Sequence, residues 1–324
     1  MPFSAKQSEL PIPLQSVFTN YLLRKIRQTR KVAKTDLCRP MLLVFPKFKI
    51  QIVPLKIDAM KTFYAVLAVF FILGSILEYF STYKEHQNYY SLKDFKSSLM
   101  LMLTALIVDL GSKIVAISLL DKLSFYSIWS LGYDWWVWIS CYILWDFVFY
   151  VKHYLEHNVR FMWAIHVNHH SSEYMNLSTS LRSGVFKASY RYFFWAIPIL
   201  IGFPLPMFLI LYGLGKVWAF FSHSQRLGNW GILEKYTITP THHNLHHSSN
   251  EDNLNKNFGE TFLIWDKLFK TYKETNKPLS FGINEKINHD DFKEVVFHEF
   301  RSMVSDFLAA KNWRQKFKIV FGKP

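Results

Sequence analysis

The chain is poor in cysteine and lacks the motifs of common redox cofactors. Cys38 and Cys141 are its two cysteines among 324 residues, too few and too far apart for a disulfide framework or a cysteine-bound metal cluster. No segment resembles a glycine-rich dinucleotide-binding fold, a haem-binding cytochrome domain or an iron–sulfur motif. Any metal must therefore have other ligands, and any redox reaction must take its electrons from another molecule.

Acidic residues are also scarce. Lys and Arg number 38 against 24 Asp and Glu, which gives a formal net charge of +14. Yet 50% of the residues are hydrophobic and 18% are aromatic, a composition that a disordered tail or a simple nucleic-acid-binding arm does not have. We therefore expect a membrane and its lipids as partners, and no nucleic acid.

Most of the positive charge lies in residues 1–59, which hold eleven Lys or Arg against three acidic residues. Prolines interrupt this segment, and it has no charge-free apolar run with a cleavage site, so it lacks the pattern of a signal peptide. Two interpretations stay open: a basic extension that lies on anionic lipid, or residues that precede a true start at Met60. In both, residues 60–324 form the functional domain.

Three apolar segments of membrane-spanning length follow. Residues 62–80 are apolar except for Glu78, residues 98–120 form a second run, and residues 134–150 form a third that is rich in tryptophan. The pattern predicts an all-α, polytopic membrane helical bundle.

The second run is flawed by two charged residues near its centre. Asp109 and Lys113 are four residues apart, a spacing that lets them pair on one face of a helix and lowers the cost of carrying both into a bilayer. A break or re-entrant turn at Gly111 is the alternative.

A fourth apolar segment, residues 192–221, is split in the middle by Gly202, Pro204 and Pro206. At about 1.5 Å rise per residue, each half is short for a full crossing, so we expect a helical hairpin that enters and leaves on one face. Such a hairpin brings its two histidine-rich flanks to the same side of the membrane.

The distribution of lysines predicts which side that is. Residues 82–97 carry three lysines and residues 121–133 carry one, so the first loop is the better cytoplasmic one. The histidines then form a cytosolic cap on a multi-pass protein. The same count places the segment before residue 62 outside, in conflict with its positive charge.

Most of the thirteen histidines fall between positions 153 and 247. Asp146 and Tyr150 precede two of them at helical spacing, so one helix face leads from the third span into the histidine region. One H-x3-H and two H-x2-H-H clusters result. They are His153 and His157; then His166, His169 and His170; then His243, His246 and His247, with His223 and His242 nearby.

These clusters point to metal binding. Many imidazoles with pKa values near 6.5 are costly to pack together unless cations bind their neutral nitrogens. Nine ligands exceed the three or four of one zinc site, so two ions are the economical interpretation, with Zn, Fe, Cu or Ni all open. The string from His153 to His157, which includes Glu156, also fits an inverted zinc-peptidase motif, so a zinc-dependent membrane hydrolase is an alternative. A metal transporter is another.

The order H-x3-H, H-x2-H-H, H-x2-H-H, with an apolar hairpin before the last cluster, resembles the membrane fatty acid hydroxylase and sterol desaturase superfamily. The resemblance covers roughly residues 145–272. The strings HHSSEYMNLSTSLR, FSHSQ, TPTHHNLHH and NFGETFLIWDKLFKTY are most similar to its alkylglycerol monooxygenase branch.

The resemblance implies two iron ions, and His242 is then a tenth ligand or a group that orients one. Fatty acid hydroxylases of this superfamily carry a further histidine four residues before the position of His223, where this chain has Ala219. The residues implied as iron ligands are His153, His157, His166, His169, His170, His223, His243, His246 and His247. Those expected to complete or orient the ligands are Asp146, Glu173, Asn176 and Asp266.

The resemblance also implies a reaction. Two irons with histidine ligands can use O2 and two external electrons to hydroxylate or desaturate a C–H bond of a lipid. Relatives take electrons from cytochrome b5, ferredoxin-like proteins or tetrahydrobiopterin, and the residues do not choose among them. The basic residues Lys267, Lys270, Lys273 and Lys277 are a candidate docking surface for an acidic carrier protein.

Overall fold

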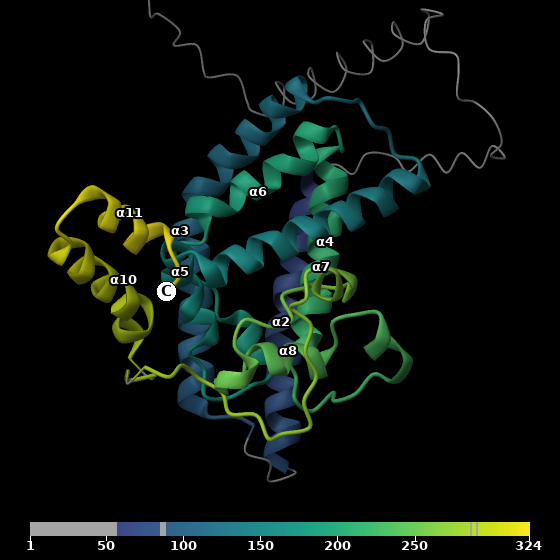
Figure 1. The fold of residues 1–324 in the computed structure, drawn as a ribbon. Helices are drawn as coiled ribbons and strands as arrows, with labels where there is room; N and C mark the ends of the chain where they lie inside the picture. Colours follow the sequence, from purple (N-terminus) through teal and green to yellow (C-terminus); the bar gives the residue numbers. More distant parts are fainter. Residues whose placement is uncertain (1–56, 85–88, 286, 290) are drawn as a thin grey trace, which may run out of the picture. The chain divides into compact units, whose positions relative to one another are not determined.

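The computed structural model describes residues 57–84, 89–285, 287–289 and 291–324, so almost all of the basic segment 1–59 lies outside the described residues. Within these ranges the chain is helical and forms no β-strand, which confirms the all-α class (Figure 1). The α-helices are α2 (Ile57–Lys84), α3 (Leu92–Leu123), α4 (Trp135–Asn158), α5 (Arg160–His170), α6 (Ala188–Ile201), α7 (Leu205–Ser222), α8 (Pro240–His246), α9 (Ile264–Leu268), α10 (Phe292–Ala309) and α11 (Trp313–Phe321).

Three segments are long and apolar enough to cross a membrane. They are Thr62–Tyr83, Leu92–Tyr126 and Leu205–Ser222. Large apolar side chains along the first two face outward, such as Ile107, which is 75% exposed, and a bilayer would cover them. Helix α4 carries charged residues and histidines in its second half, and α6 has only 14 residues. The number of crossings and the cytoplasmic side of the histidines stay predictions.

Helix α3 runs unbroken through Gly111, so the break considered there is wrong. The expected pair of Asp109 with Lys113 is also wrong, because α6 packs on this part of α3 and supplies better partners. Asp109 Oδ1 lies 2.5 Å from Arg191 Nη2 and accepts a hydrogen bond of 2.7 Å from the Tyr192 hydroxyl. Lys113 instead lies over the ring of Tyr64, 5.5 Å from its centre.

Helices α6 and α7 are consecutive and pack against each other, with their turn at Gly202. Gly202 has φ +123°, which side chains with a Cβ rarely adopt, and a Cβ there would lie 2.1 Å from the carbonyl oxygen of Trp129. Pro204 directly precedes α7, where its missing backbone N–H costs nothing because the first turn of a helix has no acceptors for its N–H groups. The chain therefore reverses at the point where glycine and proline interrupt the apolar run.

The main apolar core joins α3, α4, α6 and α7. Its largest buried members include Trp145, Trp195 and Phe208, whose rings pack edge to face with centroids 5.1–5.6 Å apart. Helix α4 leaves this core and continues for two more turns, and α5 begins immediately after it. A rigid apolar core thus fixes the direction in which α4 presents its two histidines.

Candidate metal centre

Two groups of histidines meet where α4, α5, α7 and α8 come together. Within each group the nearest ring nitrogens all lie within 4.8 Å of one another, and eight of the nine side chains are buried. The five-histidine group consists of His153, His157, His166, His170 and His246. The four-histidine group consists of His169, His223, His243 and His247. Every histidine that the sequence resemblance implies as an iron ligand lies in one of these groups.

Each H-x2-H-H cluster divides between the two groups. From α5, His166 and His170 join the five-histidine group and His169 joins the other; from α8, His243 and His247 join the four-histidine group and His246 crosses over. Around the helix axis, position i+4 lies about 40° to one side of position i, whereas i+3 lies about 60° to the other side, so the three side chains share a face but point to different neighbours. Each triplet therefore supplies ligand atoms to both groups.

Backbone carbonyls orient four of the rings. The Nδ1 atoms of His153, His169, His223 and His246 donate hydrogen bonds of 2.5–2.9 Å to carbonyl oxygens of Phe258, Arg182, Ala219 and Lys256, respectively. Because a carbonyl can only accept, the proton sits on Nδ1 and the lone pair of Nε2 points into the group. Ala219 thus contributes through its backbone carbonyl.

The geometry of His169 and His223 favours a bound cation. Their Nε2 atoms lie 3.1 Å apart, and both carry a lone pair because both Nδ1 atoms are donors. Burial lowers the pKa of His223 to about 3 and lowers that of His169 as well, so neither ring gains a proton to bridge them at neutral pH. Two lone pairs at this distance repel each other unless a metal ion binds both.

Unpartnered nitrogens in the two groups support the same conclusion. The Nε2 atoms of His157, His246 and His247 are buried and have no hydrogen-bond partner among the described residues. Burial lowers the pKa of all nine imidazoles, to about 4 for His246, so the rings are neutral donors of lone pairs. Buried polar atoms usually have partners, and metal ions would satisfy these. The donor set therefore fits one metal ion in each group.

Asp266 positions His153 through the backbone. Its carboxylate accepts hydrogen bonds of 2.8 and 2.9 Å from the amides of Phe258 and Gly259, and a third from the Thr271 hydroxyl. The carbonyl of Phe258 is the one that orients His153. Asp266, a candidate orienting residue from the sequence, therefore acts indirectly: it holds the backbone of Phe258, whose carbonyl contacts His153.

Asp146 does not orient a histidine, contrary to expectation. Its carboxylate accepts hydrogen bonds from the amides of Thr261 and Phe262 and from the Trp265 indole. It thereby ties α4 to the segment that carries Phe258. Helical spacing places Asp146 on the same face of α4 as His153 and His157, but its carboxylate is occupied by the backbone amides of Thr261 and Phe262.

The three remaining candidates also lie outside the two groups. Glu173 is 60% exposed, and its carboxylate lies 3.8 Å from Nε2 of His289. Asn176 caps a short 3-10 helix by accepting from the backbone of Ser178. His242 contacts Thr239 through Nδ1 and closes the first turn of α8.

Glu156 lies behind the five-histidine group and is fully buried. It accepts hydrogen bonds from Lys152 at 2.7 Å and the Tyr190 hydroxyl at 2.6 Å, with Lys187 at 3.3 Å. Burial raises its pKa, but the two ammonium groups outweigh that and lower it to about 2. Its Oε2 lies 3.7 Å from Nδ1 of His166, on the side away from the other imidazoles. This placement opposes the zinc-hydrolase alternative, in which Glu156 must act as a base inside the metal site.

Sequence reasoning missed Glu78 as a structural tie. It is buried in α2, accepts a 2.7 Å hydrogen bond from the amide of Leu177, and is also bonded to Tyr90 and Ser224. Ser224 follows His223 directly, so Glu78 joins the first apolar helix to the four-histidine group. The signal was a single acid inside an apolar run, which is rare without a partner.

Arg182 is a second buried charged residue that ties distant segments together. Its guanidinium is fully buried and bonds Asp94 at 3.0 Å and Ser171 at 2.6 Å. Ser171 follows His170, and the carbonyl of Arg182 accepts from His169. The residue therefore fixes the end of α5 from two directions.

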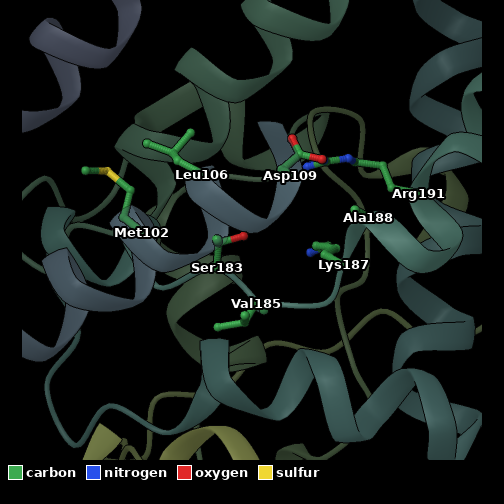
Figure 2. Close-up of a pocket in the computed structure, with 10 residues that line it drawn as sticks. Met102, Leu106, Asp109, Ser183, Val185, Lys187, Ala188 and Arg191 are labelled. Atoms are coloured by element: carbon green, nitrogen blue, oxygen red, sulfur yellow. The ribbon is translucent and has the colours of Figure 1, made fainter. Parts of the chain in front are cut away.

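A cavity of about 90 Å³ lies between α3 and the segment that leads into α6. Figure 2 shows that Asp109 and Arg191 bring their charged ends together at its wall, with Met102, Leu106 and Val185 supplying apolar surface. Lys187 also lines it and is the residue that lies 3.3 Å from Glu156. Lys187 and then Glu156, which lies 3.7 Å from His166, thus separate the cavity from the five-histidine group.

These features define a helical protein that has three helices long and apolar enough to cross a membrane and two adjacent groups of histidines suited to holding metal ions. Residues 138–271 match the model of the Fatty acid hydroxylase family, so the resemblance deduced from the histidine clusters is confirmed. The match contains nearly all of α4, the whole of helices α5 to α9, and all nine histidines.

The particular proteins it resembles are lipid-modifying enzymes by name. Alkylglycerol monooxygenase from Homo sapiens is 33% identical over 200 residues, which are 61% of this chain and 45% of that protein. The protein of the same name from Caenorhabditis elegans is 28% identical over 254 residues, 75% of this chain and 49% of that one. Ornithine lipid hydroxylase OlsE from Rhizobium tropici is 32% identical over 148 residues, 44% of each.

The chain spans less than half the length of these relatives. No solved structure matches it.

Proposed function

We propose that the protein is a membrane oxidoreductase that uses O2 and two external electrons to hydroxylate or desaturate a C–H bond of a lipid. The observation that carries this proposal is the convergence of nine imidazoles, eight of them buried, in two adjacent groups, within each of which the nearest ring nitrogens lie within 4.8 Å of one another. The similarity to an alkylglycerol monooxygenase and to an ornithine lipid hydroxylase, both active on lipids by name, supports the choice of reaction.

The two groups would hold one iron ion each. The first ion would have His153, His157, His166, His170 and His246 as ligands, and the second His169, His223, His243 and His247. When bound, the irons supply the O2 chemistry that attacks an unactivated C–H bond. An all-histidine set with neutral rings also suits zinc or copper, so the identity of the metal is the first point to test.

The rest of the chain holds and shields this centre. Carbonyls of Phe258, Arg182, Ala219 and Lys256 keep the lone pairs of four rings directed inward, so the ligands need no rearrangement to bind. The ring of Phe258 itself packs on His153, His157 and His246 with centroids 5.2–5.7 Å away and excludes water from the five-histidine group.

The cavity beside α3 is our candidate route for the lipid. Its outer wall is formed by Leu106, which is 52% exposed on a helix apolar enough to lie in a bilayer, and its inner wall by Lys187. A lipid chain could approach from the membrane while the polar groups of Asp109 and Arg191 receive its polar end. The substrate's headgroup and the electron donor, whether cytochrome b5, a ferredoxin-like protein or tetrahydrobiopterin, are left open by the residues present.

Metal analysis of the protein purified in detergent tests the proposal. We expect about two irons per chain, and O2 consumption that depends on added lipid and on a reductant. Stoichiometric zinc without iron would overturn the proposal and favour a zinc-dependent hydrolase instead. Metal uptake into vesicles without O2 consumption would show a transporter instead.

The membrane arrangement is proposed with the function. Three helices are candidates for crossing, and the three lysines of residues 82–97 support a cytoplasmic side for the histidine groups. Reaction of cysteines introduced at exposed positions of residues 225–236 with a membrane-impermeant reagent, in intact and in opened cells, checks this side.

A further inference from the structure

The last helix, α11, exposes a stripe of aromatic side chains. Trp313, Phe317 and Phe321 are 79%, 67% and 53% exposed, and they follow one another at intervals of four residues. The rings of Phe317 and Phe321 lie 4.8 Å apart, so the stripe is continuous. Side chains of this size rarely face water together unless the surface meets a membrane or another molecule.

Positive charge flanks this aromatic stripe. At about 100° of rotation per residue, Arg314 and Lys318 lie directly beside it, and both are exposed. The half-buried side chains of Ile319 and Val320 face the protein instead. Residues 307–324 contain no Asp or Glu, and their cations are Lys311, Arg314, Lys316, Lys318 and Lys323.

Helix α11 is fixed to the helix that carries three of the metal-group histidines. The carbonyl of Gly322, just after α11, accepts a 2.8 Å hydrogen bond from the amide of Arg160, the first residue of α5. The guanidinium of Arg160 also bonds Glu299 and Asp306 of α10, each at 2.7 Å. Figure 1 shows α10 and α11 beside α5.

We propose that α11 lies in the headgroup layer of the bilayer and binds anionic lipid. Aromatic rings favour the membrane interface, and a short helix with an aromatic face and flanking cations is the pattern of helices that lie in that plane. Charge complementarity selects an anionic surface, because five cations and no acid occupy this end of the chain. An acidic protein would satisfy the cations equally well but would leave Trp313, Phe317 and Phe321 without an apolar environment.

The proposal does not depend on the reaction. Its consequence is that the aromatic stripe, through Arg160, places the start of α5 at a set depth in the membrane. Helix α5 carries His166, His169 and His170, so the depth of the metal centre relative to the lipid surface follows from the same contact.

A fluorescent label on the full-length protein tests the proposal. A Cys38→Ser background leaves the buried Cys141, and an environment-sensitive dye is attached at Phe317→Cys. The protein is placed in nanodiscs of phosphatidylcholine, with or without added phosphatidylserine. We expect a shorter emission wavelength, and severalfold stronger quenching by spin-labelled lipid, in the discs with phosphatidylserine. The matched control is Gln315→Cys, which is exposed but points away from the aromatic stripe.

A charge variant separates the two parts of the proposal. Arg314→Gln with Lys318→Gln is expected to abolish the difference between the two lipid mixtures at position 317, while Lys277→Gln, an exposed residue paired with Asp252, leaves it intact. Size-exclusion profile and metal content serve to check folding. A label at position 317 that stays in water in both mixtures overturns the proposal and makes the stripe a surface for a protein. Equal burial in both mixtures overturns the preference for anionic lipid.

Discussion

His170 and His247 stack face to face, with ring centroids 4.2 Å apart and planes 19° apart, although they belong to different histidine groups. Each is the last histidine of its H-x2-H-H cluster, one on α5 and the other at the end of α8. The two histidine groups therefore share a wall of two imidazoles.

Metal content should fall by group. His157→Ala removes a ligand only from the five-histidine group, and His223→Ala only from the four-histidine group, so each is expected to reduce bound metal to about half. The double variant should bind almost none. Elemental analysis of the purified proteins gives the ratio. Full metal in the His223→Ala protein would contradict the second site.

Asp266→Ala should weaken metal binding without touching a ligand. It leaves the buried amides of Phe258 and Gly259 without their acceptor, at a cost of about 1–3 kcal/mol in the free energy of unfolding. Because the Phe258 carbonyl orients His153, a loss of roughly 10–100-fold in metal affinity is expected.

Competition with a chelator measures that affinity. Asp252→Ala is the matched control, since Asp252 is exposed and its carboxylate pairs with an exposed lysine, Lys277. Equal affinities in the two variants would show that Asp266 has no positioning role.

Glu156→Gln should destabilise the protein. The change leaves the buried ammonium groups of Lys152 and Lys187 without a negative partner, which costs about 3–5 kcal/mol. Replacing Lys152 with Met in the same protein should restore part of the loss, because one uncompensated charge is removed. Thermal unfolding in detergent measures both variants. Hydrolase chemistry predicts the reverse: a stable but inactive Glu156→Gln protein.

Glu78→Gln should loosen the contact between α2 and the four-histidine group. Its carboxylate is shared by the Leu177 amide, Tyr90 and Ser224, and an amide group offers fewer acceptor sites. We expect a lower unfolding temperature and faster loss of metal from that group. Glu251→Gln, at an exposed position, should behave like the unchanged protein. Metal release followed over time distinguishes the two.

Filling the cavity beside α3 should slow the reaction on lipid. Ala105→Trp adds a ring into a space of about 90 Å³, so kcat/KM for a long-chain lipid is expected to fall about tenfold or more while metal content stays unchanged. Ile114→Trp, also on α3 but exposed and away from the cavity, is the control. Equal activity of both variants would place the lipid route elsewhere.

Much of the site could be predicted from local spacing. An H-x2-H-H cluster puts three imidazoles on one side of a helix whatever surrounds it, and burial of neutral rings calls for metal. The orienting carboxylates could not be predicted in this way. Asp146 has the correct helical position, yet its oxygens accept hydrogen bonds from the segment around Thr261. Asp266 instead acts on His153, which is distant in the sequence, through the backbone of Phe258.

The sequence by itself determined the helices, the apolar segments and the identity of the nine histidines, because these follow from side-chain chemistry and from periods of three and four residues. Only the tertiary structure decided that His169 leaves His166 and His170 for another group, that Asp109 pairs with Arg191, and that Glu156 faces lysines. Spacing fixes which side chains share a helix face, but the packing of that face against distant helices fixes what they meet.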